Sequence, residues 1–127
     1  MKNKFVIHIF CLTPEICSMI SKFFSYNENY NFNSTSLNNP ECDTLEDLGY
    51  QPDCIIIDSE INKSLKHKIY NAYRNSTIIH LPSLTGYENE VTEDKDIVRV
   101  SEPLKLRELE EIIKNTYSTK YIDEDKI

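Results

Sequence analysis

The cysteines of this sequence are candidates to attack a substrate or to ligate a metal, and their spacing argues against a zinc site. No Cys-x-x-Cys pair is present to nucleate a zinc site. Irregular spacing is typical of small buried hydrophobes in a reducing compartment, with a reactive thiol as the alternative. The four cysteines are Cys11, Cys17, Cys42 and Cys54.

Cys11 has the position best suited to a nucleophile, because it ends a predicted strand. No basic residue that would activate its thiol can be identified nearby in the sequence. His8 and His80 lie within predicted strands and His67 on the polar side of a predicted helix, which favours packing over metal ligation. We therefore predict no metal site, no cofactor and no enzymatic activity.

Asp58 directly follows an apolar run, so it stands at the carboxyl end of a predicted central strand. An aspartate at a strand end often caps the next loop by accepting hydrogen bonds from backbone N–H groups. Gly49 and Gly86 are the only glycines in the sequence, so no glycine-rich loop exists to let phosphates approach the backbone. Nucleotide binding of the Rossmann or P-loop kind is therefore excluded.

Composition restricts the class of protein. A chain of 127 residues with 39% hydrophobic and 28% charged residues is long enough for a single domain with one core. A net charge of −7 argues against direct nucleic-acid binding, which usually needs a concentrated basic face. The run from Phe5 to Leu12 is too short to cross a bilayer, and no signal peptide precedes it, so we expect a cytoplasmic protein.

The elements that must position these residues are alternating strands and helices. Runs of β-branched and aromatic residues predict strands at 4–11, 30–37, 53–58, 77–81 and 96–100. Helical spacing and end signals predict helices from Pro14 to Tyr26, from Asn39 through Leu48, over 62–75 and over 104–117. In the helix over 62–75 the lysines and arginine are expected to face outward. Residues 82–96 form the weakest segment, where a helix would be short or irregular.

Strict alternation of strands and helices implies right-handed crossovers and a parallel sheet covered on both faces. We predict a flavodoxin-like (βα)5 α/β domain of three layers over residues 1–117, with a five-stranded parallel sheet in the order 2-1-3-4-5 and a flexible tail or linker at 118–127. In such a sheet, function gathers at the carboxyl ends of the strands. Here those ends are residues 11–13, 58–60, 81–83 and 101–103.

This pattern resembles the receiver domains of bacterial response regulators across residues 4–117. Asp58, after the run "CIII", matches the position of the phosphoacceptor aspartate of that family. The segment "SEPLKLRELEEII" resembles the family's lysine-proline turn and last helix, with Pro103 at the turn. The resemblance implies an aspartate that is phosphorylated in the presence of Mg²⁺.

The other signature positions of the family are altered. Cys11 and Leu12 stand where receivers carry the acidic pair that holds Mg²⁺, and thiol and isobutyl groups cannot replace two carboxylates. Glu102 replaces the lysine that pairs with the phosphoryl oxygens. The position of the switch hydroxyl aligns with Pro82, or with Ser83 if the alignment slips by one residue. The aromatic switch position aligns near Val98 or Arg99.

These departures favour a pseudo-receiver, a domain that resembles receivers in fold but signals through protein contacts. One alternative is a genuine phosphoreceiver that recruits Glu15 or Glu60 to an altered metal site. A further alternative is a small-ligand sensor whose pocket is lined by Cys11, Leu12, Leu81 and Pro82, which are apolar where a receiver is charged.

A protein partner or a second copy of the chain would bind the face built by the last two strand–helix units, which receivers commonly use for such contacts. We expect no membrane or nucleic-acid partner. The polar rim of this predicted interface consists of Arg99, Lys105, Arg107, Glu108 and Glu111.

Overall fold

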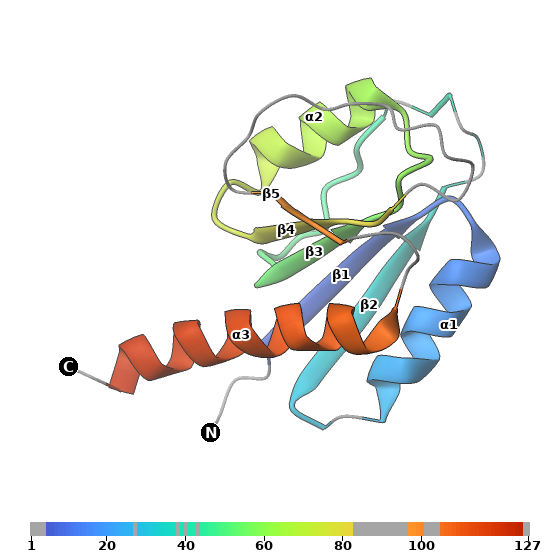
Figure 1. The fold of residues 1–127 in the computed structure, drawn as a ribbon. Coiled ribbons are helices and arrows are strands. Elements are labelled where there is room, and N and C mark those ends of the chain that lie inside the picture. Colours follow the sequence, from blue (N-terminus) through green and yellow to red (C-terminus); the bar gives the residue numbers. More distant parts are fainter. Residues whose placement is uncertain are drawn as a thin grey trace.

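The fold is a five-stranded parallel sheet with helices on both faces, seen in a computed structural model (Figure 1). The structure describes residues 5–26, 28–37, 39, 41–42, 44–82, 97–100 and 105–125, with the backbone alone at 99 and 119–125. The strands are β1 (Phe5–Cys11), β2 (Tyr30–Ser36), β3 (Cys54–Ile57), β4 (Thr77–His80) and β5 (Ile97–Arg99). Their order is β2-β1-β3-β4-β5, and every pairing is parallel, which confirms the predicted topology.

Three helices are described: α1 (Pro14–Ser25), α2 (Lys63–Ala72) and α3 (Leu106–Asp125). Pro14 occupies the first turn of α1, where its missing N–H costs no hydrogen bond. Asn62 caps α2, because its side chain accepts a hydrogen bond from the Ser64 N–H at 2.7 Å. The last helix continues past its predicted end at Tyr117, so the predicted tail is helical as far as Asp125.

The helix predicted from Asn39 through Leu48 is wrong. The described residues of this stretch form no helix, and the chain crosses the sheet as coil before β3 begins. Gly49 ends a turn rather than a helix: its φ is +78°, and its N–H donates to Asp47 Oδ1 at 2.9 Å. The short helix predicted within 82–96 falls almost entirely outside the described residues.

The two faces of the sheet are covered differently (Figure 1). One face packs against α1 and α3 through a cluster that includes Ile7, Ile20 and Leu109, all fully buried. The other face packs against α2 and the coil before β3, with Ile57 and Ile69 in its cluster. No helix in the described part of the chain is long and apolar enough to cross a membrane.

Candidate functional site

Asp58 lies just beyond β3, at the carboxyl edge of the sheet between β1 and β4. Its side chain is 1% exposed. One carboxylate oxygen, Oδ2, accepts hydrogen bonds from the N–H groups of Leu12 at 2.9 Å and Thr13 at 2.8 Å. The other, Oδ1, accepts from the Glu60 N–H at 3.1 Å. The carboxylate therefore ties the loop after β1 to the loop after β3, as a capping aspartate does.

Cys11 ends β1 next to the loop that Asp58 holds through Leu12 and Thr13. The Cys11 thiol is buried and donates to the Thr13 carbonyl oxygen at 3.2 Å. Burial raises the pKa of the Cys11 thiol, and the neighbouring Cys17 thiol and the Asp58 carboxylate raise it further. The thiol therefore stays protonated at neutral pH and is a poor nucleophile.

The described residues offer no replacement for the acidic pair of a receiver. Among them, no group of three or more histidine, cysteine or acidic side chains could hold a metal ion. Glu15 is exposed in the first turn of α1. Glu60 is half-buried and contributes its backbone N–H to Asp58. Ser83, Glu102 and Pro103 lie outside the described residues.

The loop after β4 is attached to the loop after β3. The Ser59 hydroxyl donates to the Pro82 carbonyl oxygen at 3.2 Å, and both residues are buried. The Leu81 N–H donates to the Ile57 carbonyl oxygen at 3.0 Å, which extends the β3–β4 pairing by one step. Pro82 therefore takes part in packing the loops after β3 and β4 together.

Lys66 is a buried polar residue that the sequence reasoning missed. The side chain is fully buried under α2, where its Nζ lies 2.9 Å from the Ser59 carbonyl oxygen and 2.9 Å from Nε2 of His80. The expectation that every lysine of this helix faces outward is thus wrong. Position 66 lies three residues before Ile69 and seven before Tyr73, a spacing that places it on their face of the helix.

His8 forms a second buried polar cluster, on the side of β1 that faces the coil before β3. Its Nδ1 lies 2.6 Å from the Tyr50 hydroxyl, and its Nε2 lies 2.7 Å from the Thr35 hydroxyl. Burial lowers the pKa of His8 from 6.5 to about 4, so the imidazole is neutral at neutral pH. One ring nitrogen then donates and the other accepts.

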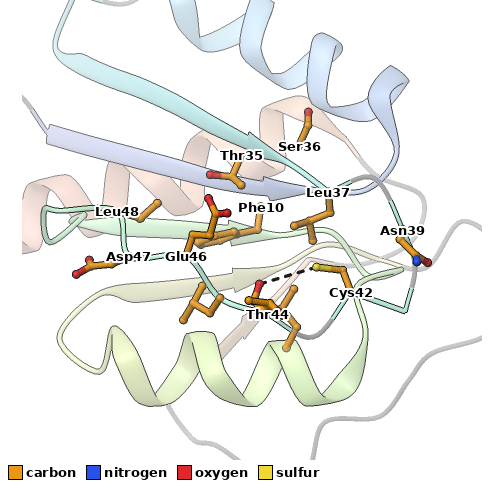
Figure 2. Close-up of a pocket in the computed structure, with 12 residues that line it drawn as sticks. Phe10, Thr35, Ser36, Leu37, Asn39, Cys42, Thr44, Glu46, Asp47 and Leu48 are labelled. Atoms are coloured by element: carbon orange, nitrogen blue, oxygen red, sulfur yellow. Dashed lines mark hydrogen bonds between the residues drawn. The ribbon is translucent and has the colours of Figure 1, made fainter.

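A pocket of about 310 Å³ opens between the coil and the sheet (Figure 2). None of the residues Cys11, Leu12, Leu81 and Pro82, predicted to line a ligand pocket, contributes to it. It is lined instead by Phe10 of β1, Leu65 of α2, and a run from β2 into the coil: Thr35, Ser36, Leu37, Asn39, Cys42, Thr44, Leu45, Glu46, Asp47 and Leu48.

The predicted interface residues lie at the start of α3. Lys105, Arg107 and Glu111 are exposed, whereas Glu108 is half-buried. Arg107 and Glu111 are four residues apart, so they lie on the same side of the helix. Arg99 belongs to β5, but its side chain is not among those described.

Comparison with known proteins supports the fold and identifies no family. No protein-family model matches the chain, and no curated protein matches it. Among solved structures, the crystal structure of an adenylate cyclase from Rhodopirellula baltica is similar, with a TM-score of 0.60 and 12% sequence identity. The match covers 97% of this chain and 96% of that one. Likeness at this level of identity shows a shared fold.

Proposed function

We propose that the domain is a cytoplasmic pseudo-receiver that signals through protein contacts, without metal-dependent phosphorylation of Asp58. The observation that carries the proposal is the environment of the Asp58 carboxylate. It is 1% exposed, and its two oxygens accept hydrogen bonds from three backbone N–H groups.

Phosphoryl transfer to Asp58 would require one of these oxygens to leave its hydrogen bonds and reach the donor. If Oδ2 were the attacking oxygen, it would leave the N–H groups of Leu12 and Thr13. If Oδ1 were the attacking oxygen, it would leave the N–H group of Glu60. Each N–H that is left buried without an acceptor costs about 1 to 3 kcal/mol. A cation that offsets the charge of the phosphoryl group would lower the barrier, but Cys11 and Leu12 supply no ligand for Mg²⁺.

The first test is the mass of the protein after exposure to acetyl phosphate with Mg²⁺. We expect no added phosphoryl group on the wild-type chain. An added phosphoryl group that disappears in Asp58→Ala would overturn the proposal in favour of a genuine phosphoreceiver. Asp53→Ala is not a suitable control, because the Asp53 carboxylate accepts the Val6 N–H of β1 at 2.8 Å. Asp47→Ala is the better one, because the Asp47 carboxylate is exposed and its bond to the Gly49 N–H lies within a local turn.

The partner is expected at the start of α3. Exposed Arg107 and Glu111 present opposite charges on one side of the helix, a pattern suited to self-association or to a partner with matching charges. The double variant Arg107→Glu, Glu111→Lys keeps the net charge but exchanges the two signs. We expect weaker self-association or partner capture by sedimentation or co-purification, and unchanged binding would count against this surface.

The exposed residue Lys63, at the start of α2, supplies the control for surface charge. Lys63→Glu changes the charge on the opposite face of the sheet, so binding through α3 is expected to stay the same. Equal losses in the α3 and α2 variants would show that charged substitutions weaken binding on either face, and would count against a specific interface on α3.

A further inference from the structure

The pocket beside the coil before β3 arises from the way the chain connects β2 to β3. Coil takes the place of the predicted helix there, and Leu37, Leu45 and Leu48 reach only half-buried positions against the second core cluster. A helix would press its side chains onto the sheet, whereas this coil arches over it and leaves a hollow of about 310 Å³ (Figure 2). This volume lies at the lower end of the range for small-molecule sites.

The floor of the pocket is apolar and well supported. Phe10 is 2% exposed and Leu65 1% exposed, so β1 and α2 hold them in place without a ligand. The apolar surface is completed by Leu37, Leu45 and Leu48, and its exposure to water is unfavourable. The floor therefore favours an apolar body such as a short alkyl chain.

The charge around the pocket has one sign. The 12 lining residues include Glu46 and Asp47 and no lysine, arginine or histidine. Asp47 is already used, because its Oδ1 accepts the Gly49 N–H, and Figure 2 shows its side chain directed away from the pocket. The Glu46 carboxylate lies on the side of the pocket that faces Thr35 (Figure 2).

The wall behind Thr35 adds no positive charge. The Thr35 hydroxyl is bonded to Nε2 of His8, and the buried imidazole is neutral at neutral pH because its pKa is lowered to about 4. The whole chain has a net charge of −7, which also favours the approach of cations. An anionic ligand would meet repulsion from Glu46 and Asp47 here, and the lining residues include no positively charged partner to offset it.

We propose that this pocket binds a small organic amine, with its apolar body on the floor formed by Phe10 and Leu65 and its ammonium group at Glu46. The site goes beyond the proposed interaction function and does not depend on the chemistry of Asp58. It adjoins the Asp58 region through β1, since the Asp58 N–H donates to the Phe10 carbonyl oxygen at 3.1 Å.

The test uses three probes with the same alkyl chain: hexylamine, hexanol and hexanoate, at pH 7. Amide NMR shifts are followed during titration of the full chain. We expect saturable shifts at Leu37, Leu48 and Phe10, with the tightest dissociation constant for hexylamine and the weakest for hexanoate. Affinities near a millimolar, roughly what so small a ligand attains, are sufficient for this measurement.

Two variants and one control separate the contribution of the head group from that of the apolar body. Glu46→Gln should weaken hexylamine about two- to five-fold, as expected for a solvent-exposed ion pair, and should leave hexanol unchanged. Glu41→Gln, at an exposed acidic residue that does not line the pocket, should change neither. Cys42→Trp should fill the hollow and abolish binding of all three probes.

Any of three results with the wild-type chain would overturn the proposal: no saturable shifts with hexylamine, shifts confined to other parts of the domain, or hexanoate binding as tightly as hexylamine. If Cys42→Trp does not fold, the Glu46→Gln comparison still decides the matter. Equal affinity of that variant and the wild type for hexylamine would remove Glu46 from the site and contradict the proposal.

Discussion

The two faces of the sheet differ in how completely helices and apolar side chains cover them. We call the face under α1 and α3 the sealed face. The face under α1 and α3 is filled by aliphatic and aromatic side chains, and Phe5, Phe24, Tyr30 and Tyr117 meet edge to face there. The face under α2 buries the polar residues His8, Lys66 and His80, and it carries the pocket. The second face is thus the one whose buried polar groups and pocket can respond to ligand or pH.

The largest expected difference between the faces is in the response to loss of a leucine. Leu109→Ala removes a fully buried side chain from the sealed face and should lower the free energy of unfolding by about 3 to 5 kcal/mol. Leu45→Ala removes a half-buried side chain beside the pocket and should cost about 1 kcal/mol. Urea denaturation measures the free energy of unfolding of both variants, and equal losses would contradict the expected difference between the two faces.

The second difference is in the response to acid. Folded His8 stays neutral down to a pKa of about 4, whereas an unfolded chain protonates this residue below about 6.5. The unfolded state therefore binds more protons between these two pH values, and stability falls as the pH falls through that window. The full effect corresponds to roughly 3 kcal/mol, present above pH 6.5 and lost by about pH 4.

The measurement is the difference in unfolding free energy between the wild type and His8→Gln, from pH 7 to pH 4. We expect the wild type to lose about 3 kcal/mol relative to the variant over this range. A flat difference for His8→Gln would mean that His8 is not held neutral by burial.

The third and smallest difference concerns lysines within one helix. Lys66→Met removes the Nζ that bonds to the Ser59 carbonyl oxygen and to His80, so we expect a loss of about 1 to 3 kcal/mol. The matched change Lys63→Met, at an exposed position of α2, should stay within about 0.5 kcal/mol of the wild type. Chemical denaturation compares the two, and a Lys66→Met variant as stable as the wild type would show that the buried amino group is dispensable.

The sealed face was largely predictable from the sequence. Ile16, Ile20 and Phe24 recur at helical spacing in α1, and the apolar run of β3 indicates a central strand covered on both sides. These patterns repeat over many residues, so they determine both the elements and their order. The strand order and the helices that cover this face were predicted from these apolar patterns.

The second face was less predictable, because its features depend on single residues. Leu45 and Leu48 have a spacing that suits a helix, but the turn at Asp47 and Gly49 and the acidic residues around it allow coil instead. The inward position of Lys66 was present in the spacing to Ile69, but the charge of the side chain argued the other way. Backbone N–H partners for Asp58 were anticipated from its place at a strand end, but no residue type reveals that two of them belong to Leu12 and Thr13 in the loop after β1.

The most direct test of the central claim, that Asp58 is a loop cap and not a phosphoacceptor, is an amide NMR titration with Mg²⁺ followed by beryllofluoride, which mimics a phosphorylated aspartate. The account predicts no saturable shifts at Leu12, Thr13, Asp58 or Glu60. Saturable shifts at these amides would mean that the carboxylate can leave its backbone partners and coordinate the mimic, and the pseudo-receiver proposal would be contradicted.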